Sequence, residues 1–272
     1  MEYETMGGEE IPKIGLGTWR MEGSTCRDAV STALDLGYRH IDTAQAYGNE
    51  REVGQAIEHS DVDRDEIFLT TKVWPMNRKR ADIVNSVNES LTKLGTEYVD
   101  LLLIHWPNPL ASTGEVMRTL SDLQSDGLAR HIGVSNFDAE QLETAREKAT
   151  VDVFTDQVQF HPFNPQEELL EYCQENDVLL TAYSPLAHGG AMHDHVLTEL
   201  GNKYNKTPAQ VALRWVTQQE KVITIPKSTS EEHLEQNLDI FDFELTETEM
   251  AIVARPSRLQ TGLSMVRGRL GR

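Results

Sequence analysis

The sequence predicts an α/β fold, a single (β/α)8 TIM barrel over residues 1–272 with an N-terminal β-hairpin and a C-terminal loop. Short apolar runs alternate with amphipathic helical patterns along the chain, and counting from Ile14 there are eight strand-like runs, each followed by a helix. Such alternation indicates a parallel sheet, and eight units indicate closure into a barrel. A length of 272 residues suits one barrel of this kind.

The elements follow in order from the amino terminus. Residues 3–11 predict a hairpin that turns at Gly7-Gly8, and Ile14–Trp19 predicts a short buried strand whose two glycines indicate close backbone approach. The remaining strands are expected at 39–42, 67–72, 99–104, 130–134, 154–159, 178–182 and 222–225. The helices are expected at 25–36, 50–58, 79–93, 114–126, 138–148, 166–176, within 194–218, and at 230–238.

Two further segments follow the eighth unit. Residues 245–254 predict an extra helix, with Thr246 as its cap and Glu249 three residues on. The tail from Arg255 is rich in arginine and glycine. We interpret it as a loop over one mouth of the barrel, with a disordered end as the alternative.

The charge of the chain restricts its partners. Asp and Glu number 44 against 25 Lys and Arg, a formal charge of −19, so neither nucleic acid nor an anionic membrane is an expected partner. Residues 1–10 are polar and no apolar run approaches a membrane span, so we expect a cytoplasmic protein. We also expect a monomer. The acidic, lysine-poor composition suggests a high-salt cytoplasm. Cys26 and Cys173 are expected to be free thiols.

Three consecutive predicted strands end in residues suited to chemistry. The first ends at Asp42, the second at Lys72 and the third at His105, and Tyr47 lies on the loop just past the first. The loops at the carboxyl end of a barrel build its active site. A lysine at the end of an apolar strand is costly to bury unless it is paired, and Asp42 is the obvious partner.

Plainer interpretations exist for these residues. Asp42 and Lys72 suit a structural ion pair beside an unrelated histidine and tyrosine, although four such residues on successive strand ends favour a site. A metal site at residues 193–195 is disfavoured, because adjacent residues on a helix face apart. No metal is therefore expected.

The motifs in combination resemble the aldo-keto reductase family, particularly the prokaryotic branch that includes 2,5-diketo-gluconate and methylglyoxal reductases. The resemblance runs in unbroken order from about Ile14 to Asn237. It is carried by Asp42-Thr43-Ala44-Gln45 with Tyr47-Gly48-Asn49-Glu50, Thr71-Lys72, Ile104-His105-Trp106-Pro107, Gly133-Val134-Ser135-Asn136-Phe137, Gln157-Val158-Gln159, Tyr183-Ser184-Pro185-Leu186 and Ile225-Pro226-Lys227-Ser228-Thr229. It implies reduction of a carbonyl by hydride transfer from a nicotinamide dinucleotide, without a Rossmann domain.

The four strand-end residues suit this chemistry. The carbonyl oxygen gains negative charge during reduction, so donors must already point at it. Tyr47 is the expected general acid, and Lys72 is expected to lower its pKa, which is about 10 in a free tyrosine. Asp42 anchors Lys72, and His105 donates a second hydrogen bond to the carbonyl.

The resemblance also implies a cofactor site around the carboxyl mouth. Ser135, Asn136 and Gln157 suit the nicotinamide carboxamide, and Tyr183 would stack on the ring. Turn capping, a buried glutamine and a packed aromatic are the respective alternatives. Further expected contacts are Thr18, Asp42, Ser184 and Leu186, because residues 184–190 would cross the pyrophosphate.

The eighth strand is followed by a candidate phosphate site. Lys227, Ser228 and Thr229 precede a helix and suit the 2′-phosphate of NADP, with helix capping as the alternative. Many NADPH-dependent members carry an arginine six residues after this lysine, where this chain has His233. Histidine offers no bidentate fork. With Asn237 as a further contact, we expect NADPH to be preferred modestly and NADH to be usable.

Three tryptophans complete the expected site. Trp19, Trp74 and Trp106 follow strands one, three and four, and with Tyr47 and His105 they would line a substrate pocket, with core packing as the alternative. The sequence thus predicts an NAD(P)H-dependent reductase of small aldehydes, ketoaldehydes or keto sugars. The rival hypothesis is a cofactor-sensing regulatory subunit of the same fold without significant turnover.

Overall fold

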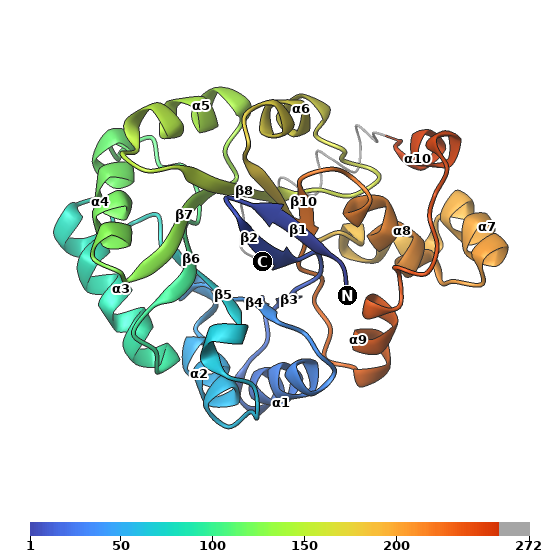
Figure 1. Ribbon diagram of the computed structural model, residues 1–272, viewed down its shortest axis with the longest axis horizontal. Helices are drawn as coiled ribbons and strands as arrows, with labels where there is room; N and C mark the ends of the chain where they lie inside the picture. Colours follow the sequence, from blue (N-terminus) through green and yellow to red (C-terminus); the bar gives the residue numbers. More distant parts are fainter. Residues whose placement is uncertain (256–272) are drawn as a thin grey trace.

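The computed structural model describes residues 1–255, and in this part a ring of parallel strands is surrounded by helices (Figure 1). The sheet has eight strands in sequential order, each hydrogen-bonded to its neighbour. They are β3 (Leu16–Gly17), β4 (His40–Asp42), β5 (Phe68–Val73), β6 (Val99–Ile104), β7 (Ala129–Ser135), β8 (Val153–Gln159), β9 (Leu179–Tyr183) and β10 (Val222–Thr224). The predicted (β/α)8 fold is thereby confirmed.

The helices lie outside the strands and cover them. They are α1 (Gly23–Asp35), α2 (Glu50–Glu58), α3 (Arg80–Leu94), α4 (Thr113–Ser125), α5 (Ala139–Lys148), α6 (Glu167–Glu175), α7 (His195–Tyr204), α8 (Pro208–Thr217), α9 (Glu231–Leu238) and α10 (Glu247–Val253). Residues 1–255 also contain three short 3-10 turns, η1 (Gln45–Tyr47) after β4, η2 (Arg64–Glu66) before β5 and η3 (Ala187–His193) after β9. The cap of α10 is the expected one, because Thr246 and Glu249 form a reciprocal capping box.

The first and last strands meet and close the barrel. Ile14 forms a parallel bridge with Thr224, and the Gly15 amide donates to the Thr224 carbonyl at 2.8 Å. The two glycines are required by close contacts, as predicted. A Cβ on Gly15 would lie 2.6 Å from His40 Cγ, and one on Gly17 would lie 2.6 Å from the Ile225 carbonyl oxygen.

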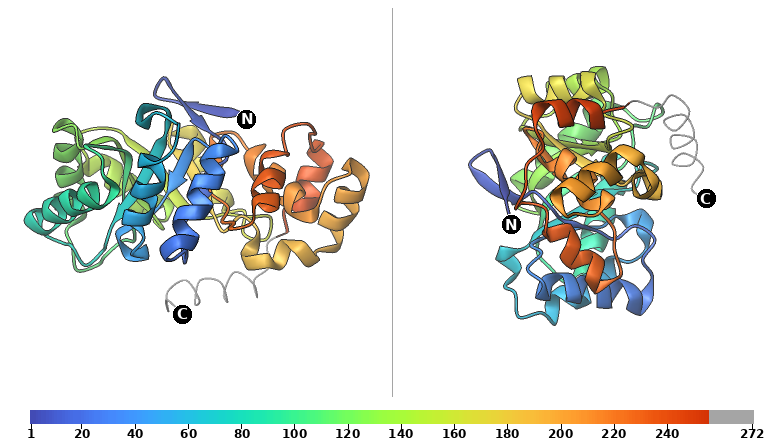
Figure 2. Two further views of the ribbon diagram at one scale, coloured as in Figure 1. Left: turned by 90° about the horizontal axis from the view of Figure 1, so that it is seen from below. Right: turned by 90° about the vertical axis from the view of Figure 1, so that its right-hand side faces the viewer.

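The N-terminal hairpin closes the amino-terminal mouth of the barrel. Its strands are β1 (Tyr3–Met6) and β2 (Glu9–Pro12), joined at Gly7-Gly8 as expected, and the hairpin projects from one end of the molecule (Figure 2). Met6 and Ile11 from the hairpin pack with inward-facing apolar side chains of the barrel, namely Phe68, Leu101, Leu103, Phe154, Leu179 and Ile223. Burial of this surface makes the amino-terminal end a packed plug, since apolar contact is the main stabilising term.

The carboxyl-terminal mouth is free of that plug. Of the large apolar side chains exposed in the described residues, Trp19, Trp74, Met76, Leu110 and Met192 all lie on connections that follow the carboxyl ends of strands. Arg255, the last described residue, binds the Pro162 carbonyl through its backbone amide and pairs with Asp194 at 2.6 Å. The loop expected over one mouth otherwise falls on residues 256–272, outside the described part.

None of the helices in residues 1–255 is both long enough and apolar enough to cross a membrane. Cys26 and Cys173 lie buried in α1 and α6 as free thiols.

Candidate active site

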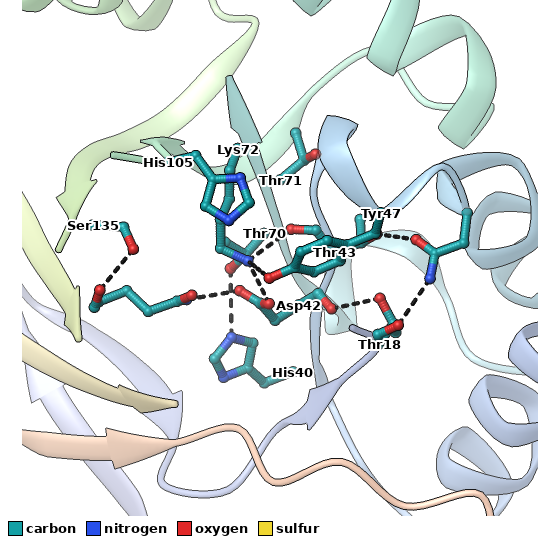
Figure 3. A network of polar contacts seen from close by, with 12 residues as sticks. Thr18, His40, Asp42, Thr43, Tyr47, Thr70, Thr71, Lys72, His105 and Ser135 are labelled. Carbon is teal, nitrogen blue, oxygen red and sulfur yellow. Dashed lines mark hydrogen bonds and ion pairs between the residues drawn. The ribbon is translucent and has the colours of Figure 1, made fainter. Parts of the chain in front are cut away.

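Four side chains meet at the carboxyl ends of β4, β5 and β6 (Figure 3). Asp42 is the last residue of β4, Lys72 the penultimate residue of β5, and His105 the residue after β6. Tyr47 ends η1, the turn that follows β4. Parallel strands present their carboxyl ends at one edge, so residues distant in sequence converge there.

Lys72 is the hub of this group. Its side chain is fully buried, and its ammonium donates to Asp42 Oδ1 at 2.6 Å, to the Thr43 carbonyl at 2.9 Å and to the Tyr47 hydroxyl at 3.2 Å. An ammonium has three protons to donate, so these three contacts satisfy it. Burial lowers the pKa of Lys72, and the Asp42 carboxylate opposes that shift. The expected ion pair is therefore present and extends to Tyr47.

Asp42 makes hydrogen bonds through both its carboxylate and its backbone carbonyl. Its side chain is 1% exposed, and its second carboxylate oxygen accepts a hydrogen bond from the Gln157 amide at 2.7 Å. Its backbone carbonyl accepts from both the hydroxyl and the amide of Thr18. Burial raises the pKa of Asp42, while Lys72 and Gln157 lower it. These contacts fix Asp42 as the anchor of the lysine.

Tyr47 is half-buried, and its pKa is shifted in the direction opposite to the one predicted. Burial, and then the charge of Asp42, raise the pKa of Tyr47 well above 10, whereas the sequence led us to expect a pKa lowered by Lys72. The prediction was wrong for this structure because Asp42 balances the lysine charge and burial favours the neutral phenol. Tyr47 therefore holds its proton throughout the neutral range.

His105 lies beside Tyr47 and Trp74. Its ring lies 5.6 Å from the Tyr47 ring and 6.3 Å from the Trp74 ring, in edge-on arrangements. Burial, and then the Lys72 charge, lower the pKa of His105 to about 3, so the imidazole is neutral at ordinary pH. A neutral imidazole has one N–H to donate and one nitrogen that accepts. Its Nδ1 is buried without a hydrogen-bond partner in the described residues.

A chain of polar contacts joins His105 to the expected nicotinamide residues. Asn136 donates to the His105 carbonyl at 3.0 Å and to the Ser135 hydroxyl at 2.9 Å, and it accepts from the Tyr183 hydroxyl at 2.7 Å. Ser135 in turn donates to the Gln157 carbonyl at 2.7 Å. Asn136 adopts φ of 64°, a left-handed conformation that asparagine tolerates better than most residues. The structure thus brings all four together beside the strand-end group.

These side chains fit a nicotinamide by their chemistry. The group offers hydroxyl and amide donors and acceptors next to the half-buried ring of Tyr183, and a carboxamide needs both kinds of partner. The Gln157 amide nitrogen is already used by Asp42, so its remaining capacity is the carbonyl oxygen. Ser184 and Leu186 follow β9 at the start of η3, where Ser184 has φ of 50°.

The expected phosphate residues lie at the beginning of α9. Lys227 and Thr229 are exposed, and the Lys227 ammonium donates to the Arg20 carbonyl at 3.2 Å. Ser228 is buried and binds the backbone of Ser230, the residue that caps α9. His233 is exposed in the first turn of that helix, and Asn237 is buried further along it.

The three tryptophans near the carboxyl-terminal mouth differ in their exposure to solvent. Trp19 and Trp74 are 37% and 44% exposed, and Trp19 lies 6.3 Å from His188 in η3. Trp106 is half-buried and lines, with Phe137, an apolar cavity of about 20 Å³. Trp19 and Trp74 thus form an open rim, whereas Trp106 packs partly inward.

Some residues near the site had no role assigned from the sequence. Asn49 and Glu50 are buried, and Glu50 accepts a hydrogen bond from Thr71, the neighbour of Lys72, at 2.7 Å. Gln45 accepts from the Trp74 amide at 2.8 Å. Their place directly around Tyr47 in the motif was the available signal. Within residues 1–255, no three His, Cys, Asp or Glu side chains group to hold a metal, and Asp194 instead caps α7.

Comparisons with known proteins agree with this geometry. The family model described as the aldo/keto reductase family matches residues 13–256. A 9,11-endoperoxide prostaglandin H2 reductase of Trypanosoma cruzi is 41% identical over 244 residues, which cover 88% of this chain and 86% of the relative. A methylglyoxal reductase of Escherichia coli O157:H7 is 41% identical over 248 residues, covering 90% and 92%.

A solved structure described as a 2,5-diketo-D-gluconic acid reductase B superposes with a TM-score of 0.91. Its sequence is 44% identical to this chain, and the match covers 93% of this chain and 90% of that one. The barrel, its closing strands and its carboxyl mouth are therefore shared with solved members of one family.

Proposed function

Because the chain belongs to the aldo/keto reductase family, we propose that it reduces aldehyde and ketone carbonyls with NADPH as its preferred cofactor and Tyr47 as the proton donor. The observation that carries this proposal is the contact of the Lys72 ammonium with the Tyr47 hydroxyl at 3.2 Å inside a buried, paired site. The cofactor would supply the hydride. The relatives' names cover dicarbonyl, sugar-acid and endoperoxide substrates, so they support the reaction class more than one substrate.

Tyr47 and His105 would receive the carbonyl oxygen. Both rings face one space, and each offers a donor there, the phenol O–H and the imidazole N–H. Fixed donors aimed at the oxygen stabilise the negative charge that develops on it during reduction. A neutral His105 is suited to this task because it donates without competing for the proton.

Lys72 would act after the proton begins to move. In the resting site its charge is balanced by Asp42, and the pKa of Tyr47 is high. When the phenol gives its proton to the substrate oxygen, a phenolate forms 3.2 Å from the ammonium and is stabilised by it. A group that stabilises only the charge formed in the transition state raises the rate without tightening substrate binding.

The cofactor would lie across the carboxyl mouth. Ser135, Asn136 and Gln157 would bind the carboxamide, Tyr183 would support the ring, and residues 184–190 would cover the pyrophosphate. The Thr18 hydroxyl donates to the Asp42 carbonyl, so Thr18 would act on the cofactor site by positioning Asp42. Lys227, Ser228, Thr229, His233 and Asn237 would form the adenosine end. The exposed Lys227 ammonium supports a modest preference for NADPH over NADH.

The substrate would enter between the tryptophans. Trp19 and Trp74 would form the outer walls and Trp106 an inner one, around Tyr47 and His105. We propose small aldehydes, ketoaldehydes or keto sugars as substrates. A cytoplasmic location, a monomeric state and adaptation to high salt stay predictions from the composition.

The test is a spectrophotometric screen of carbonyl compounds with NADPH and NADH, at low and high salt. Wild-type protein should oxidise NADPH in the presence of methylglyoxal or a similar small carbonyl. Lys72→Met should abolish most of that turnover, and Lys148→Met, on the exposed end of α5, should leave it intact. Tight cofactor binding with no turnover on any carbonyl would favour a cofactor-sensing subunit instead.

A further inference from the structure

Asn49 is a buried polar residue at the base of the turn that carries Tyr47. Its side chain is 2% exposed and makes three hydrogen bonds. Its carbonyl oxygen accepts from the Thr43 hydroxyl at 2.7 Å, and its amide nitrogen donates to the carbonyls of Thr18 and Met21 at 2.9 and 3.0 Å. A buried amide that is satisfied this fully is expensive to disturb.

These contacts close a ring of hydrogen bonds around the end of β4. Asn49 binds Thr43 and Thr18, and Thr18 binds the Asp42 carbonyl through both its hydroxyl and its amide. Asp42 and Thr43 are consecutive, so the ring encloses the peptide between them. These two residues supply two of the three acceptors of Lys72, the Asp42 carboxylate and the Thr43 carbonyl.

The hydrogen bond between the Thr43 hydroxyl and the Asn49 side chain also spans the turn that carries Tyr47. Residues 45–47 form η1, which begins just after Thr43 and ends just before Gly48 and Asn49. The Thr43–Asn49 bond therefore joins the two ends of the turn, while Gly48 with φ of 70° lets the chain reverse into α2. The turn, and with it the Tyr47 hydroxyl, is tied to Thr43, whose carbonyl accepts from Lys72.

We propose that Asn49 is a positioning residue that sets the separation between the Tyr47 hydroxyl and the Lys72 ammonium. It touches neither of the two side chains and acts through Thr43. One bond from Asn49 holds the proton donor's turn, and the same bond holds an acceptor of the lysine. The inference deepens the proposed reductase function and rests on it.

The next residue provides a second tie of the same kind. Glu50 opens α2, is 2% exposed, and accepts a hydrogen bond from the Thr71 hydroxyl at 2.7 Å. Thr71 directly precedes Lys72 in β5. The start of α2 is thereby bound through Asn49 to Thr43, the residue that follows β4, and through Glu50 to β5. These two strands carry the ion pair.

The sharpest test changes Thr43, because its backbone carbonyl stays available to Lys72 whatever its side chain. Thr43→Val keeps the shape and deletes the hydroxyl that Asn49 accepts, and Thr43→Ser keeps the hydroxyl as a rescue. Thr217→Val in α8 is the matched control, since Thr217 is also fully buried and donates to a backbone carbonyl at 3.0 Å, far from the site. Asn49→Asp, which keeps the acceptor and removes both amide donors, is the second variant.

We expect Thr43→Val to lower kcat by about ten- to a hundredfold, because misplacement on the order of 1 Å costs about that much. The solvent deuterium isotope effect on kcat should rise as proton transfer becomes slower, while the Kd for NADPH stays within about threefold. Thr43→Ser should restore kcat, and Thr217→Val should lower the melting temperature without changing kcat or the isotope effect. Asn49→Asp should lower kcat in the same direction.

Failure of the inference can be told apart from failure of the proposed function. A wild-type enzyme that reduces carbonyls, with Thr43→Val within twofold of it or with an unchanged isotope effect, would overturn the role of Asn49. If the wild type reduces no carbonyl, the proposed function fails. A crystal structure of Thr43→Val then decides the inference alone, since an unaltered 3.2 Å separation of Tyr47 and Lys72 would overturn it and a longer one would support it.

Discussion

Each mouth of the barrel contains a buried, paired carboxylate, and the two differ in their cationic partners. Asp100, near the start of β6, is 1% exposed and pairs with Arg64 at 2.8 Å and Arg130 at 3.2 Å. Both arginines reach solvent, with exposed fractions of 22% and 43%. Asp42 is equally buried at the other mouth, but its partner Lys72 is buried completely.

The difference separates the candidate site from an ion pair at the protein surface. At the amino mouth both arginines reach solvent and lie over the ring of Tyr98, and Arg130 also donates to the Tyr98 hydroxyl at 3.1 Å. Solvent therefore screens the charges of this group. At the carboxyl mouth Lys72 donates to Asp42, to the Thr43 carbonyl and to the Tyr47 hydroxyl. The Tyr47 ring lies 5.6 Å from the ring of His105, which lies 6.3 Å from that of the exposed Trp74. Both carboxylates are buried, and at each mouth a cation contacts a tyrosine hydroxyl. What distinguishes the candidate site is that its cation, Lys72, is buried completely.

We expect the largest effect from a comparison of two tyrosines, one at each mouth of the barrel. Tyr47→Phe removes the proposed proton donor and should lower kcat by about a hundred- to ten-thousandfold, the usual contribution of a general acid. Cofactor affinity should stay within a few fold. Tyr98→Phe is the matched change at the amino mouth, where the hydroxyl only accepts from Arg130 at 3.1 Å, and it should leave kcat within twofold. Steady-state kinetics of both variants decide it, and a Tyr47→Phe variant at near-normal rate contradicts the assignment.

The next prediction compares the two carboxylates directly. Asp42→Asn leaves the fully buried Lys72 without its counter-charge, which should lower the free energy of unfolding by about 3–5 kcal/mol and abolish most turnover. Asp100→Asn should cost less stability because its arginines reach solvent. It should also leave kcat unchanged. Urea denaturation and kinetics on both variants test this, and equal losses of activity would remove the distinction between the mouths.

Apolar side chains at the two mouths give the third comparison. Ile11 is fully buried in the hairpin plug, so Ile11→Ala should lower the free energy of unfolding by about 2–5 kcal/mol with kcat unchanged. Trp74 is 44% exposed at the open mouth, so Trp74→Ala should change stability by only about 0.5 kcal/mol. It should raise KM for bulky carbonyls. If Ile11→Ala changed the kinetics and Trp74→Ala the stability, the hairpin plug and the tryptophan rim would have been assigned to the wrong ends of the barrel.

Two buried histidines of the barrel should make its stability depend on pH. Burial, and then the Lys72 charge, lower the pKa of both His40 and His105 to about 3, against about 6.5 in the unfolded chain. The unfolded state therefore binds more protons between these values. The stabilisation is fully present above about pH 6.5 and is lost as the pH falls toward 3.

Melting temperatures between pH 7 and pH 4 test this expectation. Wild-type protein should lose stability steadily on acidification, and His105→Gln should lose less over the same range. The rate of reduction should show no titration near pH 6.5, because His105 stays neutral there. A kinetic step at that pH that disappears in His105→Gln would show that the imidazole is not neutral in the working enzyme.

The smallest expected effect lies at the edge of the carboxyl mouth. His233→Arg adds a bidentate cation in the first turn of α9 and should tighten NADPH by roughly three- to tenfold, since the position is exposed and solvent screens the charge. NADH affinity should be almost unchanged. Quenching of protein fluorescence gives both dissociation constants, and equal gains for the two cofactors would show that position 233 does not face the 2′-phosphate.

The sequence was most informative where chemistry and strand ends coincide. Asp42, Lys72 and His105 could be placed because apolar runs end at them, and the fold brings such ends together whatever the details. The strand expected at Ile14–Trp19 is shorter in the structure. Leu16 and Gly17 pair with β4 whereas Ile14 pairs with Thr224 on the other side, so its extent depends on how the ring closes.

Other features depend on tertiary contacts that no local pattern encodes. Gln157 was expected to serve the cofactor, and the structure also gives its amide nitrogen to Asp42 across the barrel. The pKa of Tyr47 is raised and not lowered because the balance between burial, Asp42 and Lys72 is set by distances in the fold. Asn49 stood in the motif, but its ring of partners appears only when β3 and β4 lie side by side.

The seam between Ile14 and Thr224 has a consequence for how the molecule assembles. It joins segments near opposite ends of the described chain, so it is among the last contacts that a growing polypeptide can make. Strands β4 to β6, with the ion pair and His105, are contiguous and can associate early, since neighbouring elements need little loop closure. Trp19 and Lys227 follow the two strands of the seam, so the Asp42–Lys72 pair should form during synthesis well before these two residues are brought together.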